Sequence, residues 1–195
     1  LFGRYGKIYY EMDIKPLCMI KPFKGANILQ VTQGFHGGHK AIDIVSTYGT
    51  ALTAPEACRV VRIYGDGKID GSTAELAYGY GVRLKGLETG QQYLYWHTWP
   101  YLPVWSGDIV KAGQIVAFMG NSGNVFTGGQ YVALFERTVS PFKGTHLHLE
   151  MFDSSGSPRD PVPLIRWDIE PNYTTQDYLK AVSATLLKIS KLAFR

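Results

Sequence analysis

Short alternations of apolar and polar residues run along most of the chain and predict β-strands rather than helices. The run 58–64 is rich in β-branched residues, which favour extended structure. The runs 80–84 and 91–97 flank a Gly-containing turn and predict an antiparallel pair, and 109–120 has the pattern of a hairpin. We therefore expect a mainly β fold, a compact domain built on an antiparallel sheet.

A helical period is found near the C-terminus, over residues 178–193. The apolar residues that recur there are Tyr178, Val182, Leu186, Ile189 and Ala193. Residues 174–177 resemble a helix start, and basic residues flank the apolar stripe. The pattern predicts an amphipathic helix that packs on the domain or links to a neighbour. Contact with a membrane surface or with a protein partner is the alternative interpretation.

The chain divides into one domain and two flanking segments. Residues 1–21 form a lead-in with little regular pattern, residues 22–165 form the domain, and residues 166–195 form a helical extension. Within the domain, the stretch at about 124–143 contains apolar and aromatic residues, so we expect this insertion to have structure of its own. With 195 residues, the chain can bury a core without a disulfide or a structural metal.

Composition and charge narrow the possible partners. The 22 Gly, 10 Pro and 13 Tyr residues favour turns and strands, and 45% of the chain is hydrophobic. The net charge is +4 and the pI is near 9.0, but no dense Lys/Arg block accompanies them, so we expect no nucleic-acid binding. No apolar stretch is long enough to span a membrane. Cys18 and Cys58 lack metal-site spacing, and whether they pair is open.

Four of the five histidines lie in three short segments, together with one aspartate. Because side chains two or four apart in a strand point to the same face, His146 and His148 project together, and His39 can share a face with Asp43. His97 ends a third segment. A single histidine in a strand is usually structural, but here that explanation must hold several times over. Imidazole and carboxylate groups suit Zn²⁺, so the pattern predicts a zinc hydrolase.

Three further residues are candidates for supporting roles. Glu150 shares the strand face of His148 and is a candidate for orienting it, although a solvated or ion-paired carboxylate is the alternative. Tyr95 shares the predicted strand face of His97 and is a candidate for lining the site, with an aromatic core position as the alternative. His36 has no partner at a diagnostic interval, so its role is supporting or incidental.

The motifs and their order resemble the lysostaphin-type, or LytM-like, metallopeptidases. They are H-x-x-x-D at 39–43, Tyr-Trp-His at 95–97 and H-x-H at 146–148. The run 107–123 resembles the segment that precedes the last motif in this family. The likeness covers roughly residues 22–165 and rests on the combined motifs, since H-x-H alone is weak.

The resemblance implies a fold of the duplicated hybrid motif type, with a groove for an extended peptide. His39, Asp43 and His148 match the family's zinc ligands, with one Zn²⁺ per chain. His97 and His146 match two catalytic histidines that do not bind the metal. One of them accepts a proton from the attacking water, and the other stabilises the oxyanion; the sequence leaves open which does which.

The implied substrate is peptidoglycan, hydrolysed in its stem or cross-bridge peptides. The expected location is the bacterial cell envelope, periplasmic or extracellular, or a phage-encoded endolysin acting on the wall. Trp99, Tyr101 and Trp105 are candidates for groove walls, with ordinary packing as the alternative. The insertion at about 124–143 departs from the family pattern and forms either a wall that sets specificity or a lid.

Two other functions are open. A non-catalytic relative binds wall fragments or activates a partner hydrolase, but such members typically lose zinc ligands, and all three are present here. The glucose-specific carrier domains of the sugar phosphotransferase system have a related β-architecture and transfer phosphate through paired histidines. They have no use for an H-x-x-x-D element, and fold analogy alone is weak support.

Overall fold

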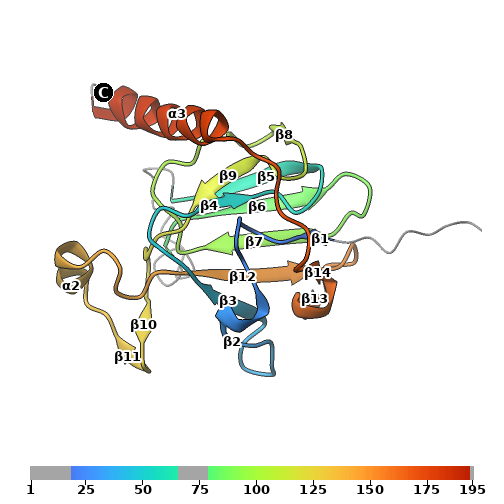
Figure 1. The fold of residues 1–195 in the computed structure, drawn as a ribbon, viewed down its shortest axis with the longest axis horizontal. Coiled ribbons are helices and arrows are strands. Elements are labelled where there is room, and N and C mark those ends of the chain that lie inside the picture. The colour runs from blue at the N-terminus through green and yellow to red at the C-terminus, as the bar shows by residue number, and fades with distance from the viewer. Residues whose placement is uncertain (1–18, 66–78, 194–195) are drawn as a thin grey trace, which may run out of the picture.

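The computed structural model describes residues 19–65 and 79–193, and its main feature is a large β-sheet (Figure 1). This sheet has eight strands, with the path β2-β3-β12-β7-β6-β5-β8 and with β13 paired to β12. The strands are β2 (Val31–Gln33), β3 (Ala41–Val45), β12 (His146–Phe152), β7 (Gln92–Trp96), β6 (Gly81–Gly86), β5 (Cys58–Tyr64), β8 (Ile109–Val110) and β13 (Pro158–Arg159). Every pairing within it is antiparallel, so the predicted fold class is confirmed.

Smaller elements complete the domain. The remaining strand pairs are β1 (Met19–Ile20) with β14 (Ile165–Arg166), β4 (Ala51–Thr53) with β9 (Ile115–Phe118), and β10 (Phe126–Thr127) with β11 (Gln130–Tyr131). Two 3₁₀ turns, η1 (Ile28–Gln30) and η2 (Val162–Leu164), and two helices, α2 (Leu134–Val139) and α3 (Thr175–Ala193), are also present. The predicted hairpin over 109–120 is wrong, because β8 pairs with β5 while β9 pairs with β4. All four residues of β9 are buried, and this apolar strand therefore lies in the interior.

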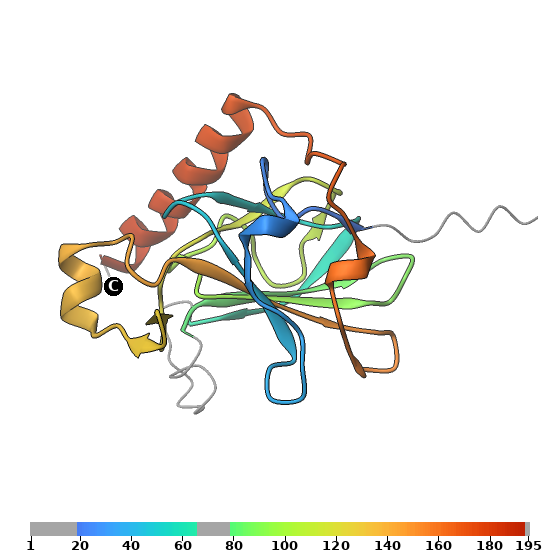
Figure 2. The same ribbon diagram turned by 60° about the horizontal axis from the view of Figure 1, so that its bottom comes forward.

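The core lies between the large sheet and the β4–β9 pair (Figure 2). Side chains from β3 and β12 face it, among them Ile42, Ile44, Leu147 and Leu149, all fully buried. Since alternate residues of a strand point to opposite faces, burial of Leu147 and Leu149 directs the histidines beside them to the other face. Burial of the apolar residues of β12 therefore sets the face to which its alternate polar residues point.

The predicted C-terminal helix is confirmed as α3. Its start is a capping box, in which the Asp177 N–H donates to Thr174 Oγ1 at 3.1 Å and the Thr174 N–H donates to Asp177 Oδ2 at 2.8 Å. In the part of the chain that the structure describes, no helix is long and apolar enough to cross a membrane.

The face of α3 that packs on the domain differs from the predicted stripe. Tyr178, Ala181 and Val182 contact the domain beside Phe118, but Leu186 is 58% exposed. Lys188 instead points inward, where its Nζ donates to the Val104 carbonyl at 2.6 Å and lies 3.7 Å from the centre of the Trp105 ring. The Lys188 side chain, which contacts a carbonyl acceptor and an aromatic ring, is thus buried where the helical period predicted an aliphatic contact.

Cys58 is buried and free, whereas Cys18 lies outside the described residues. Burial, together with the nearby Glu56 charge, raises the pKa of the Cys58 thiol to about 12. Because the thiolate is the reactive form, we expect Cys58 to resist iodoacetamide in the native protein and to react once the chain is unfolded without reductant. Peptide mapping by mass spectrometry measures this. Rapid labelling of the native protein would contradict the burial of the thiol.

Candidate metal centre

Three neighbouring strands, β3, β12 and β7, bring candidate ligands to the face of the sheet that is opposite the core. His148 of β12 pairs directly with Asp43 of β3 on one side and with Trp96 of β7 on the other. Directly paired residues of neighbouring strands project to the same face, so these three side chains are neighbours. The predicted common face of the H-x-H pair is confirmed, because the intervening Leu147 is in the core.

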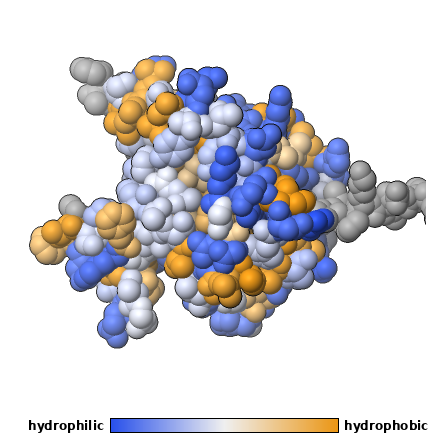
Figure 3. Space-filling model, in the orientation of Figure 1, coloured by the Kyte–Doolittle hydropathy of each residue, from blue (hydrophilic) through white to orange (hydrophobic). Residues whose placement is uncertain are grey.

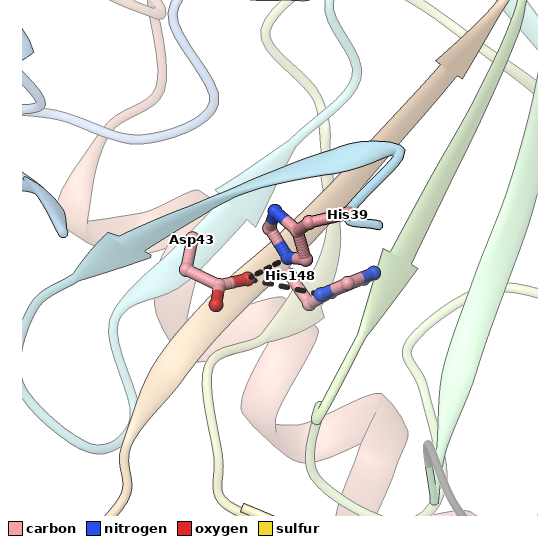
Figure 4. A group of neighbouring side chains, drawn as sticks. All are labelled: His39, Asp43 and His148. Carbon is pink, nitrogen blue, oxygen red and sulfur yellow. Dashed lines mark hydrogen bonds and ion pairs between the residues drawn. The ribbon is translucent and has the colours of Figure 1, made fainter. Parts of the chain in front are cut away.

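A tight turn brings His39 to the same place. The backbone of His39 pairs with that of His36 through hydrogen bonds of 2.8 and 3.1 Å, and two glycines form the turn between them. Figure 4 shows His39 and His148 next to each other, with a nitrogen of each ring directed at the same oxygen of the Asp43 carboxylate. His39 Nε2 is 3.4 Å and His148 Nδ1 is 2.9 Å from Asp43 Oδ1. One candidate ligand atom from each of the three residues lies within 4.8 Å of the others.

The hydrogen bonds of His39 fit a metal ligand. Its Nδ1 donates to the Gly34 carbonyl at 3.0 Å, which leaves Nε2 directed at Asp43. This Nε2 is buried and has no hydrogen-bond partner. A divalent cation between the ring nitrogen and the carboxylate would satisfy both groups. Two imidazoles and one carboxylate suit Zn²⁺ and leave a coordination position open, so His39, Asp43 and His148 fit a zinc ion.

The contact between Asp43 and His148 shifts their pKa values in opposite directions. Burial raises the pKa of Asp43, but the hydrogen bond from His148 and the nearby histidines outweigh burial and hold the pKa below its usual value. Burial lowers the pKa of His148, but hydrogen bonds to Asp43 and Glu150 outweigh it and raise the pKa to about 9. A metal must displace the proton from His148 Nδ1, so metal affinity is expected to fall as the pH falls.

Glu150 contacts the other side of His148. Its Oε1 lies 3.6 Å from His148 Nε2 and accepts a hydrogen bond of 2.9 Å from Trp96 Nε1. The carboxylate is therefore held against the ring nitrogen that does not face Asp43, as an orienting group requires. Sequence reasoning missed Trp96, although strand alternation places it on the opposite face from Tyr95.

Replacing Glu150 with glutamine is expected to weaken zinc binding about 10-fold to 100-fold, because the neutral amide no longer fixes the His148 ring or raises its basicity. Competition with a zinc-sensitive chelating dye measures the affinity. The matched control is Glu88→Gln, which removes an exposed carboxylate from the turn after β6. Equal zinc affinity in the two variants would show that Glu150 does not support the ligand.

His97 reaches the site through an unusual backbone conformation. It follows the last residue of β7 with φ of 61°, in the left-handed region. This conformation costs non-glycine residues about 1–3 kcal/mol and persists where the surroundings impose it. The ring is held by its Nδ1, which donates to the Ser122 carbonyl at 2.7 Å.

The predicted common face of His97 and Tyr95 is wrong for this reason. Strand alternation ends at Trp96, and the left-handed residue turns the His97 ring away from the core. Tyr95 itself is fully buried on the core side, where its hydroxyl donates to the Thr53 carbonyl at 2.9 Å. The candidacy of Tyr95 for lining the site is therefore corrected, and it is a core residue.

His97 and His146 form a second pair beside the candidate ligands. Their ring centroids are 4.5 Å apart. His146 Nδ1 donates to the Gly144 carbonyl at 2.9 Å, and its Nε2 lies 3.9 Å from Asp43 Oδ1. Burial, then the neighbouring His146, lowers the pKa of His97 to about 3, and burial also lowers the pKa of His146. Both rings are thus neutral at neutral pH, with Nδ1 donating and Nε2 able to accept a proton.

A cleft of about 920 Å³ lies over these side chains. Its lining includes His39, Asp43, His97, His146 and His148. None of Trp99, Tyr101 and Trp105 lines it, so the expectation that they form its walls is corrected. Trp99 packs on Phe118, with ring centroids 4.9 Å apart, and Trp105 lies under Lys188. His36 does not line the cleft and contacts His39 through its backbone and ring, so a supporting role for it stays a prediction.

Comparison with known proteins identifies the family. The sequence profile described as peptidase family M23 matches residues 37–161, which is more than half of the chain and contains all the candidate site residues except His36. The chain belongs to peptidase family M23. The predicted lysostaphin-type family is thereby confirmed. A search of curated proteins gave no match.

Solved structures of this M23 chain's relatives agree with the fold. LytU is 25% identical with a TM-score of 0.50, and the alignment covers 69% of this chain and 82% of LytU. A zinc containing peptidase from Vibrio cholerae is 18% identical with a TM-score of 0.51, covering 73% and 39%. The antimicrobial peptidase lysostaphin from Staphylococcus simulans is 22% identical with a TM-score of 0.50, covering 69% and 48%. The chain thus spans less than half the length of the last two proteins.

Proposed function

We propose that this chain is a zinc-dependent endopeptidase that hydrolyses peptide bonds in the stem or cross-bridge peptides of peptidoglycan. One observation carries the proposal: three ligand-type side chains and two neutral histidines line a single cleft. Membership of a peptidase family and the likeness to a zinc containing peptidase support the reaction type and the metal. The bacterial envelope, or a phage product acting on it, is the proposed setting.

His39, Asp43 and His148 would hold the metal, with His39 oriented by the Gly34 carbonyl and His148 by Glu150. A bound zinc ion supplies Lewis-acid chemistry, which lowers the pKa of water and polarises a peptide carbonyl. The remaining chemistry belongs to the chain.

His97 and His146 provide the proton transfers. Because the Nδ1 atoms of both donate to backbone carbonyls, the Nε2 atoms are the ones that can act as proton acceptors. A neutral Nε2 accepts a proton from the attacking water, and the same nitrogen returns it to the departing amine. The second ring takes up a proton from solvent on its Nε2, donates a hydrogen bond from it to the developing oxyanion, and returns the proton to solvent after the products leave. Their contact, with centroids 4.5 Å apart, allows both rings to reach one reacting peptide.

Digestion of purified sacculi of several chemotypes tests the proposal. The zinc-loaded protein should release peptide-containing fragments, a chelator should stop the release, and added zinc should restore it. A control digestion with an unrelated zinc-loaded protein excludes contaminating activity. Binding to sacculi without any release, in every chemotype, would contradict the proposal and support a non-catalytic wall-binding or hydrolase-activating role.

A further inference from the structure

The insertion within the domain is a projecting arm, here defined as residues 124–143. It contains the β10–β11 hairpin and α2, and Figure 1 shows it extending from the end of the large sheet. Gly128 and Gly129 form the hairpin turn with φ of 57° and 78°, values that glycine adopts without strain. The expectation of structure within the insertion is confirmed.

Hydrogen bonds fix the arm to the domain. Arg137 of α2 donates from Nη1 to the carbonyls of Asn121, at 2.6 Å, and Gly123. The Asn121 side chain donates in turn to the carbonyls of Pro141 and Lys143 at 3.0 and 3.1 Å. Both ends of the arm are thus tied together next to the site. These contacts favour a fixed wall over a lid.

The arm exposes six large apolar side chains. They are Phe126, Tyr131, Leu134, Phe135, Val139 and Phe142, each more than half exposed. Figure 3 shows hydrophobic surface on this projecting part of the molecule. Phe126 and Phe142 line the cleft that contains the histidines, whereas Phe135 and Val139 do not. The exposed aromatic residues therefore divide into two that face the site and others that face elsewhere.

The position of Phe126 relative to the site is set by its neighbours. The Gly144 N–H donates to Thr127 Oγ1 at 3.1 Å, which ties β10 to the residues just before His146. The Phe126 ring also contacts Tyr131 edge-on, with centroids 5.9 Å apart. Phe126 is held in place although 57% of it is exposed, so little conformational entropy is lost when a ligand covers it.

The lining of the cleft that comes from β2 and β3 carries, apart from Asp43, no charged side chain. It includes Thr32 and Gln33 of the edge strand β2, Val45 at the end of β3 and Ser46 after it. Among the described residues that line the cleft, Asp43 is the one acidic or basic side chain apart from the histidines. A charged substrate group away from the metal would find no ion-pair partner among these residues, whereas an apolar group would find the two phenylalanines.

We propose that Phe126 and Phe142 form a specificity site that binds an uncharged, apolar part of an extended peptide next to the bond that is cut. This proposal rests on the proposed function of the cleft and assigns the arm the role of its apolar wall. The rings bind through the apolar surface that the peptide buries against them. They are binding residues and take no part in the proton transfers.

The test compares the double variant Phe126→Ala/Phe142→Ala with the matched control Phe135→Ala/Val139→Ala, which removes similar apolar surface from the same arm. Sedimentation with purified sacculi in the presence of a chelator measures binding without hydrolysis. We expect the first variant to lose about 10-fold or more in affinity, and the control to stay within about two-fold of wild type. On sacculi with zinc, the first variant should show a raised KM with a nearly unchanged kcat. The bonds cut should have an uncharged residue on at least one side.

The outcomes separate this inference from the proposed function. If the wild type cleaves sacculi and the two double variants bind and cleave equally well, the specificity site is overturned and the peptidase stands. If the wild type binds without cleaving but the Phe126/Phe142 variant binds weakly, the two rings bind wall peptide as proposed, but the peptidase and the place of the rings beside a cleaved bond are overturned. Absence of both binding and cleavage overturns both. Cleavage confined to bonds flanked by charged residues overturns the assignment of an uncharged ligand.

Discussion

Replacing His148 with alanine is expected to abolish stoichiometric zinc binding and to reduce hydrolysis of sacculi about 10³-fold or more. His148 contributes one of three ligand atoms that lie within 4.8 Å of one another, and it is the residue that Asp43 and Glu150 both contact. Two remaining ligands cannot hold the ion in a defined geometry. Metal analysis of the purified protein and fragment release from sacculi measure the two effects.

Glu88→Gln is the control for this loss. It changes an exposed residue that does not line the cleft, so it should retain zinc and activity. Circular dichroism of each variant checks that the sheet is intact. A His148→Ala protein that binds zinc at the wild-type stoichiometry would contradict the assigned ligand set, whatever its activity.

Replacing His97 or His146 with alanine is expected to separate metal binding from chemistry. Neither residue belongs to the metal group, so zinc content should stay at the wild-type level. Hydrolysis should fall about 10²-fold to 10⁴-fold, the range for loss of a positioned acid–base group. The same metal analysis and sacculus digestion measure both quantities on one preparation. The distinguishing result is full zinc content with little fragment release.

Two results would oppose this division of roles. Loss of zinc from either variant would make that histidine a ligand. If both variants kept wild-type rates, neither histidine would transfer a proton, and the proposed mechanism would have no acid or base.

The part of the site that follows strand alternation could be predicted from the sequence. In β12, Leu147 and Leu149 enter the core and His148 faces Asp43, as a period of two requires. The C-terminal helix and its Thr174 cap were likewise readable from local spacing. These features depend on neighbours within one element, which is the information that a single sequence carries.

The part of the site that depends on an irregular backbone conformation, or on partners distant in sequence, could not be predicted from the sequence. His97 leaves the alternation through a left-handed backbone that no residue-type preference indicates, so its ring does not share the core-facing side of Tyr95. Trp96 gains its role through Glu150, which is 54 residues away. The buried face of α3 is set by the Val104 carbonyl and the Trp105 ring, which receive Lys188.

Sacculus digestion in isotopically labelled water, followed by mass spectrometry of the fragments, tests the central claim most directly. Hydrolysis of a peptide bond places one oxygen of the labelled water in a new carboxyl group and leaves a matching free amine. We predict labelled carboxyl groups within stem or cross-bridge peptides when the wild-type protein is loaded with zinc, and none with His148→Ala. Fragments released by cleavage of the glycan, or without labelled peptide carboxyl groups, would contradict the assignment of a peptidoglycan endopeptidase.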